Sequence, residues 1–249
     1  MKTDFPGYGV IIQARCSSTR RPRKVLADIH GLPMILRQLR RLERAIVVPK
    51  LIVATSTDPS DDALEELCLT NGFDCFRGPL HDVMLRYIDC AKEYQLDNII
   101  RVGGDDILID PDCCNYLAEI QSLTPHDFLY ASNYDGWPYG TAAELISLKA
   151  LERIYGKTKE ERYHQILTSY FFEFSNEFRM KRIVAPEEKR RPSYYFSVDY
   201  EEDLELIRQI FKRLRKEGDY FGLEAVIKLI DKNPALLQGN RHLHSGFQH

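Results

Sequence analysis

No run of apolar residues in the 249-residue sequence approaches the roughly 18 residues that indicate a membrane-spanning helix. The first residues also lack the apolar core of a signal peptide, which predicts a cytoplasmic protein without membrane insertion. An excess of positive charge is missing too, because 34 lysines and arginines face 37 aspartates and glutamates, for a net charge of −3. This balance argues against a nucleic-acid partner held by bulk attraction to phosphate.

Common signatures of metal and nucleotide binding are also absent. The six cysteines form no C-x-x-C pair, and no histidine lies near them at zinc spacing, so we interpret them as reduced, mostly buried thiols. No G-x-x-x-x-G-K-[ST] segment occurs, which argues against a P-loop ATPase. The glycines of segment 7–9 precede the first predicted strand, whereas a dinucleotide fingerprint follows its strand. A dehydrogenase is therefore disfavoured.

Short apolar runs alternate with helical patterns along most of the chain. The runs predict strands at 10–12, 51–54, 73–76, 98–102, 128–131, 145–147 and 194–198. Helical spacing and cap residues predict helices at 33–46, 58–72, from 82, from 110, and at 160–174, 201–216 and 221–230. This order predicts an α/β fold of three layers, with a mostly parallel central sheet covered by helices on both faces. We expect one domain over 1–240 and a loose polar tail over 241–249.

Three polar features follow predicted strands. They are the basic loop 15–24, the pair Asp105-Asp106, and Asp199. Ligands of open parallel sheets bind beyond the carboxyl ends of the strands, which favours one shared site. A solvated basic loop and two helix-capping aspartates remain the alternative. As a site, the serines and backbone N–H groups of the loop can cradle phosphates, its cations can neutralise them, and two carboxylates can hold Mg²⁺. This constellation suits attack on a nucleoside triphosphate.

The segment 11–26, IIQARCSSTRRPRKVL, resembles the nucleotide-binding signature of the cytidylyltransferases that activate sugar acids. It is most similar to the branch named after the spore-coat polysaccharide biosynthesis cytidylyltransferase. Segment 27–35 continues in the manner of the 3-deoxy-manno-octulosonate enzymes, and the acylneuraminate enzymes are related. Segments 101–106 (RVGGDD) and 198–205 (VDYEEDLE) resemble later family blocks, so the likeness covers about residues 9–235.

The resemblance implies a Rossmann-like nucleotidyltransferase fold, CTP as donor, Mg²⁺ as cofactor and release of pyrophosphate. The catalytic residues that it implies are Arg15, Arg20, Lys24, Asp105 and Asp199, the last two as metal ligands. The implied nucleotide-binding residues are Gln13, Ala14, Arg15, Ser17, Ser18, Lys24, Thr55, Arg77 and Gly104. The implied acceptor-binding residues are Asn133, Glu144, Arg162 and His164. The partners are then CTP and a small-molecule acceptor, and a homodimer stays open.

The segment 136–144 departs from the family pattern. It reads GWPYGTAAE where many relatives read Arg-Thr-x-Pro-Arg-Gly-Leu-Asp-x-Glu, so two arginines that would suit an acidic acceptor are absent. We therefore expect poor use of common eight-carbon and nine-carbon sugar acids, and an acceptor whose charge is bound elsewhere, by Arg162 or His164. His164 is equally compatible with a structural role. Trp137 either lines the acceptor pocket or is an exposed aromatic in a dimer contact.

These observations favour a cytidylyltransferase that acts on a sugar acid or related acceptor in surface polysaccharide or glycoconjugate biosynthesis. Alternatives are an enzyme for a phosphosugar, phosphorylated alcohol or phosphonate, and a catalytically weak nucleotide-binding paralogue. A nucleic-acid binder that uses loop 15–24 conflicts with the net charge and with the lack of aromatic residues in that loop.

Overall fold

One seven-stranded sheet runs through the computed structural model, which describes residues 5–18, 20–45, 49–215 and 220–247. The strands are β1 (Tyr8–Gln13), β2 (Lys50–Ser56), β3 (Asp74–Gly78), β4 (Asn98–Gly103), β5 (Phe128–Tyr130), β6 (Glu144–Ser147) and β7 (Met180–Arg182). Their order in the sheet is β3-β2-β1-β4-β6-β5-β7. Neighbours among the first four run parallel, β6 is antiparallel to β4 and β5, and β7 is parallel to β5. The predicted fold class is confirmed.

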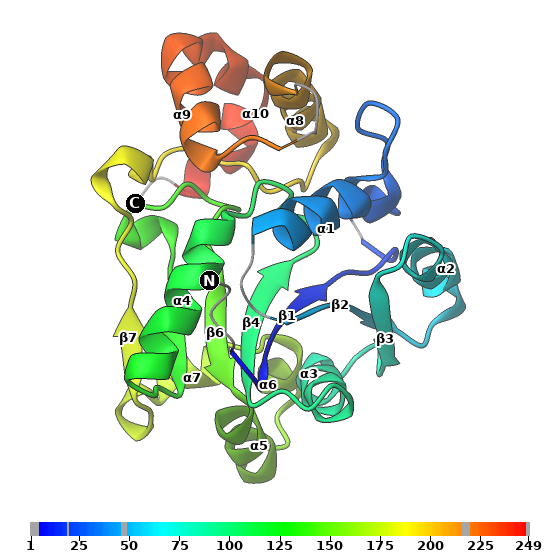
Figure 1. Cartoon of the computed structure of the whole chain (residues 1–249), viewed down its shortest axis with the longest axis vertical. Coiled ribbons are helices and arrows are strands. Elements are labelled where there is room, and N and C mark those ends of the chain that lie inside the picture. Colours follow the sequence, from blue (N-terminus) through cyan, green and yellow to red (C-terminus); the bar gives the residue numbers. More distant parts are fainter. Residues whose placement is uncertain (1–4, 19, 46–48, 216–219, 248–249) are drawn as a thin grey trace.

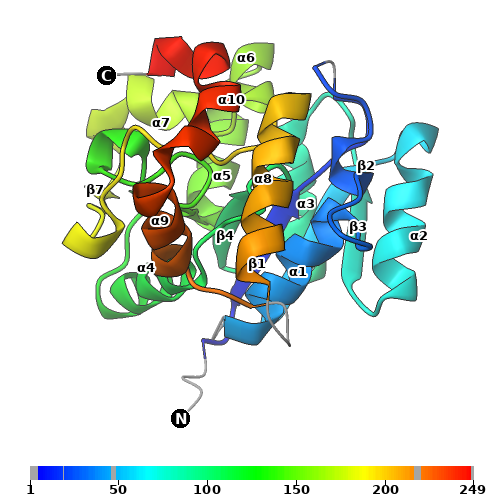
Figure 2. The same cartoon turned by 90° about the horizontal axis from the view of Figure 1, so that it is seen from above.

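Helices cover both faces of the sheet (Figures 1 and 2). One face carries α1 (Met34–Ala45), α2 (Asp62–Thr70), α4 (Pro111–Leu123), α8 (Glu201–Leu214) and α9 (Leu223–Lys232). The other carries α3 (Val83–Glu93), α5 (Leu148–Lys157), α6 (Glu161–Gln165) and α7 (Ser169–Glu173). Successive residues of a strand point to opposite faces, so Val10 and Ile12 of β1 enter one core and Ile11 enters the other. Burial on both faces explains why the central strands are continuous apolar runs.

The predicted strands at 10–12, 51–54, 73–76, 98–102, 128–131 and 145–147 correspond to β1–β6, whereas the prediction for 194–198 is wrong. That segment makes only an isolated bridge, in which Tyr139 N donates to Tyr194 O and Phe196 N donates to Tyr139 O. Its apolar residues are buried under α8 without joining the sheet, which is why they read as a strand. The edge strand β7 was missed because its sequence, Met-Lys-Arg, forms no apolar run and none of its residues is buried.

The helix predicted at 160–174 is two short helices, α6 and α7. Ile166 leaves the helical region, with φ −111° and ψ 90°, which ends α6 and lets α7 start in a new direction. Because of this break, Tyr163 of α6 and Phe171 of α7 pack into the same core. The helix α5 was not predicted, although Ser147 caps it by accepting a hydrogen bond from Ala150 N. For the helix predicted at 33–46, α1 covers most of the range, and Ile46 lies outside the described residues.

The C-terminal segment packs back onto the domain instead of forming a loose tail. Residues 238–241 form α10 (Gln238–Arg241), and η7 (His242–Phe247) follows it as a 3₁₀ segment. His244 is 7% exposed because its ring stacks on Tyr195 and bonds to Asp203. The prediction of a loose tail is wrong for this part, and residues 248–249 lie outside the described chain.

Two further expectations concern thiols and membranes. All six cysteines are free, and five of them are buried (Cys16, Cys68, Cys90, Cys113 and Cys114). Within the described residues, no helix has the length and apolar character needed to cross a membrane.

Candidate active site

The loops after β1 and β4 touch because the two strands are parallel neighbours that end at the same level. Gln13 is the register partner of Gly103, and the next residue, Gly104, donates its N–H to Gln13 O at 2.8 Å. A Cβ on Gly104 would lie 2.7 Å from the Cβ of Ala14, so only glycine allows this approach. The predicted residues Gln13, Ala14 and Gly104 therefore form the floor of a site between the two loops.

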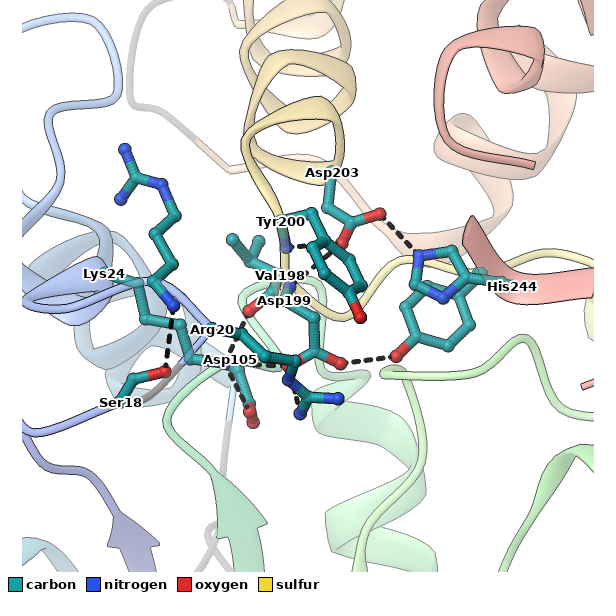
Figure 3. Close-up of polar contacts among 11 residues, drawn as sticks. Ser18, Arg20, Lys24, Asp105, Val198, Asp199, Tyr200, Asp203 and His244 are labelled. Atoms are coloured by element: carbon teal, nitrogen blue, oxygen red, sulfur yellow. Dashed lines mark hydrogen bonds and ion pairs between the residues drawn. The ribbon is translucent and has the colours of Figure 1, made fainter. Parts of the chain in front are cut away.

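Lys24 is the centre of the polar cluster in Figure 3. Its Nζ donates to Val198 O at 2.6 Å, to Asp105 Oδ2 at 3.0 Å and to Asp199 Oδ1 at 3.0 Å. The residue is 6% exposed and lies at the start of η1 (Lys24–Leu26), where the basic loop closes through a bond from Arg23 N to Cys16 O. An ammonium group has three donors, and all three are satisfied here. The structure thus brings together three predicted residues from three separate segments.

Asp199 is a buried carboxylate held in its ionised form. Oδ1 also meets Arg20 at 2.7 Å, and Oδ2 accepts a hydrogen bond from the hydroxyl of Tyr195 at 2.7 Å. Burial by itself would raise the pKa of Asp199, but the bonds from Tyr195 and Lys24 and the charge of Arg20 lower it below its ordinary value. Arg20 is the exposed member, with 53% of its side chain accessible to solvent.

A second layer of residues positions Asp199, and the sequence did not reveal it. Asp203 Oδ2 accepts from the backbone N–H groups of Asp199 at 3.0 Å and Tyr200 at 2.9 Å, which caps α8. Its Oδ1 accepts from Asn240 Nδ2 at 2.9 Å. The same oxygen lies 2.8 Å from His244 Nε2 (Figure 3). Only the position of Asp203 in the first turn of a predicted helix signalled such a cap. Nothing in the sequence tied residues 240 and 244 to it.

The predicted triphosphate loop presents most of its remaining side chains to solvent, although Cys16 is buried. Arg15 and Ser17 are exposed, and Ser18 is half-buried, with its Oγ accepting from Arg21 N at 3.4 Å. Arg21 is turned away by an ion pair with Glu201 at 2.7 Å. Thr19 lies outside the described residues. The loop therefore leaves Arg15 and the serines available to a ligand beside Lys24.

A small pocket of about 180 Å³, which we call the inner pocket, adjoins the carboxylates. Asp106 lines it, and burial, with the charge of Asp105, raises the pKa of Asp106 to about 8. Arg101 of β4 and Glu144 of β6 are register partners and form an ion pair in its wall. Within the described residues, Arg101 Nε is buried without a hydrogen-bond partner. The predicted acceptor residues Asn133 and Glu144 both line this pocket.

Trp137 also lines the inner pocket. It is 3% exposed, and its indole Nε1–H donates to Ile183 O at 2.8 Å. The alternative of an exposed aromatic side chain is wrong, because that hydrogen bond and the surrounding core bury the ring.

Four predicted site residues are not brought to the carboxylate cluster. Arg77 is held by Ser56 O and Asp58 O and by ion pairs with Asp62 and Glu65, so it fixes the loop after β2. Arg162 is an exposed side chain paired with Glu160 and Glu173. Neither guanidinium bonds to the cluster within the described residues, and His164 is likewise engaged elsewhere. Thr55 is fully buried, and no partner for its Oγ1 occurs among the described residues.

His164 joins α6 to the start of α3. Its Nδ1 lies 2.8 Å from Asp82 Oδ2, and its Nε2 lies 3.1 Å from Thr158 O. Asp82 also caps α3, because its Oδ1 accepts from Leu85 N at 2.9 Å. Burial lowers the pKa of His164, but the bonds to Asp82 and Thr158 outweigh this and raise it above its usual 6.5. The structure thus supports the structural role of His164.

We expect His164→Gln to lower the free energy of unfolding more at acid pH than at alkaline pH. A raised pKa in the folded state contributes stability that is complete below the unfolded value and is lost as pH rises through the folded value. The loss should be about 1–2 kcal/mol near pH 5.5 and smaller near pH 8.5, measured by urea unfolding. His126→Gln is the control, because burial lowers the pKa of His126 and gives the opposite dependence. An equal deficit for His164→Gln at both pH values would contradict the assignment.

Comparisons with known proteins identify the family of the chain. The profile of a family described as cytidylyltransferase matches residues 9–239. The chain is 29% identical over 231 residues to the spore coat polysaccharide biosynthesis protein SpsF of Bacillus subtilis, covering 90% of this chain and 94% of that protein. A solved cytidylyltransferase from Leptospira borgpetersenii is similar with a TM-score of 0.87 and 27% identity, over 93% of this chain and 97% of that one. CMP:2-keto-3-deoxy-manno-octonic acid synthetase complexed with CTP shares the fold, with a TM-score of 0.64 and 17% identity over 83% and 98% of the chains.

Proposed function

The chain belongs to the cytidylyltransferase family, as the resemblance predicted, and from this premise we propose that it transfers CMP from CTP to a small-molecule acceptor with release of pyrophosphate. We place this reaction in the biosynthesis of a surface polysaccharide or glycoconjugate, which the relative SpsF supports by its name. The observation that carries the proposal is the contact of Lys24 Nζ with Asp105, Asp199 and Val198 O beside the ends of β1 and β4. CTP as the donor is supported by the fold shared with a synthetase solved with CTP.

The carboxylates fit Mg²⁺ as the cofactor. Asp105 and Asp199 supply hard oxygen ligands, and both contact the same Nζ, so their oxygens lie no farther apart than twice 3.0 Å. Within the described residues, no group of three or more histidines, cysteines or acids surrounds a possible metal position. Mg²⁺ commonly uses one or two carboxylates and takes its remaining ligands from water and substrate phosphates. When bound, it would stabilise the negative charge of the phosphates.

Lys24 has two tasks in this proposal. Without ligands, its ammonium group forms ion pairs with both carboxylates and holds them at the mouth of the site. A triphosphate supplies new negative charge beside loop 15–24, and Lys24, Arg20 and Arg15 are the cations available to it. We expect Lys24 Nζ to exchange at least one carboxylate contact for a phosphate oxygen. Its charge then stabilises the pyrophosphate as the bond to the α-phosphorus breaks.

The inner pocket orients the acceptor. An acceptor oxygen attacks the α-phosphorus of CTP directly, so the protein needs no covalent nucleophile. Asn133 and Glu144 offer hydrogen bonds to acceptor hydroxyls, and Asp106 lies between the pocket and the catalytic carboxylates. Among the described residues that line this pocket, Arg101 is the one cation, and it already forms an ion pair with Glu144. An acid group beside the attacking oxygen therefore finds no unpaired positive charge among them.

We expect CTP to support pyrophosphate release far better than ATP, GTP or UTP. The test is a coupled pyrophosphate assay with each nucleotide against a panel of sugar acids, phosphosugars and phosphorylated alcohols, with Mg²⁺ present. Preference for another nucleotide would overturn the donor assignment. Tight CTP binding without turnover on any acceptor would favour the catalytically weak paralogue.

A further inference from the structure

A second pocket, of about 700 Å³, lies next to the inner pocket, and the two share Asn133. We call it the arginine pocket because Arg182, Arg190 and Arg241 line it. These residues come from the end of β7, from the segment after it, and from the end of α10. Residues 133–136, which include η3 (Asn133–Asp135), form the wall between it and the inner pocket.

The arginine pocket carries net positive charge. Asp135 is the one acid among its lining residues, and Arg182 neutralises it through Nε at 2.7 Å. Arg190 and Arg241 are exposed, and the hydrogen bond from Arg190 to Ala185 O is long, at 3.3 Å. Arg241 makes no ion pair or hydrogen bond within the described part of the chain. Two guanidinium groups are therefore available to an anion, and their forked donors suit a carboxylate or a phosphate monoester.

The backbone of Gly136 holds Arg190 in place. Gly136 has φ +93°, and a Cβ at this position would lie 2.9 Å from Arg190 Cγ, so the aliphatic stem of Arg190 packs flat across the glycine. The next residue, Arg191, donates its N–H to Gly136 O at 3.0 Å. These contacts fix the stem and reduce the conformational entropy lost when the guanidinium binds a ligand.

We propose that the arginine pocket binds a carboxylate or phosphate monoester of the acceptor, placed several bonds away from the attacking oxygen. This inference rests on the proposed function. Asp105 and Asp199 lie beside the region of attack, so an acid group on the carbon next to the attacking oxygen would meet like charge. A remote acid group reaches past Asn133 to Arg190 and Arg241. Arg190 and Arg241 of the arginine pocket thus supply the positive charge that segment 136–144 lacks.

The binding test uses Trp137, whose indole is the only one in the chain. Its N–H bonds to Ile183 O, between two residues that line the arginine pocket, Arg182 and Val184. Glucose 6-phosphate and glucuronate are titrated separately while the indole resonance is followed by NMR. The nucleotide site is saturated with the α,β-methylene analogue of CTP and Mg²⁺, so that the probes cannot bind there. We expect saturable shifts with one or both acids, and the arms distinguish phosphate from carboxylate.

Arg190→Gln and Arg241→Gln should each weaken the apparent Kd by about tenfold, since each removes one charge-assisted contact. Both side chains are exposed, so the fold should survive either change. Arg179→Gln is the matched control, because Arg179 is an exposed arginine just before β7 and outside the pocket. The proposal is overturned if neither acid shifts the indole resonance, if both variants bind like the wild type, or if neutral glucose binds equally well.

A kinetic arm separates this inference from the proposed function. Acceptors with a remote acid group should be used better than those with an adjacent one, such as 3-deoxy-manno-octulosonate, and Arg241→Gln should raise the acceptor KM with little change in the KM for CTP. Pyrophosphate release that favours adjacent acids would leave the proposed function intact and overturn the inference. Anion binding that depends on Arg190 and Arg241, without turnover of any acceptor, would support the inference and overturn the proposed function.

Discussion

Asp199→Asn is expected to lower kcat by about a thousandfold or more at physiological Mg²⁺, because it removes a proposed metal ligand worth several kcal/mol. The new amide N–H₂ group must face either Lys24 and Arg20 or the hydroxyl of Tyr195. In each orientation the cluster loses hydrogen bonds that the carboxylate accepts. Asp105→Asn should have a similar effect on kcat with a smaller effect on stability, because a third of the Asp105 side chain is exposed.

The measurement is steady-state pyrophosphate release across a Mg²⁺ titration, with circular dichroism to confirm the fold. Chelation of divalent cations should abolish wild-type turnover, and added Mg²⁺ should restore it. Asp74→Asn is the control, since Asp74 is an exposed carboxylate at the start of β3. It therefore lies at the opposite end of the parallel strands from the proposed site. Near-wild-type kcat in Asp199→Asn would show that Asp199 serves only to support the start of α8.

Lys24→Ala should lower kcat/KM for CTP by about 30-fold to 1,000-fold, which corresponds to about 2–4 kcal/mol of transition-state stabilisation. The ammonium group is buried and has three acceptors at hydrogen-bond distance. Lys24→Arg should therefore not restore activity, because a planar guanidinium presents its donors in a fixed fork that does not match the three acceptors around a compact ammonium group. Arg20→Ala should have a smaller effect, because Arg20 is half exposed and solvent screens its charge.

Lys24→Ala is also expected to affect folding, so catalysis and stability must be measured separately. Removing Lys24 leaves Asp199, whose side chain is 7% exposed, with Arg20 as its remaining cation, so the free energy of unfolding should fall. Kinetics are therefore measured at a temperature where the fraction folded is shown to be complete. Lys212→Ala, an exposed lysine of α8, is the control. Unchanged kcat/KM at subsaturating CTP in Lys24→Ala would place the basic cluster outside the reaction.

The sheet and the centre of the site could be predicted from the sequence. Strand and helix signals are local, because they depend on the spacing of apolar residues and on caps within a few positions. The alternation of strands and helices then implies parallel neighbours, and the parallel strands β1 and β4 bring Lys24 and Asp105 to one end of the sheet. Asp199 joins them although the segment before it is not a strand of the sheet. The failures at 160–174 and 194–198 have a different cause. Most of their apolar residues are buried, but tertiary contacts set a backbone path that the spacing does not encode.

The choice of ionic partners was decided only by the tertiary structure. Arg162 and His164 lie in a segment that resembles a family block, yet one pairs with Glu160 and Glu173 and the other with Asp82. Conversely, His244 was assigned to a tail and lies against Asp203. A charged side chain finds a partner among whatever groups the packed helices bring near it, and residues 41 or 82 positions apart become neighbours only after folding. The sequence by itself determined the fold class, the family and the edge of the sheet that carries the chemistry. The packing of distant segments decided which carboxylates hold Lys24 and which arginines line a pocket, because long-range contacts leave no periodic trace in the chain.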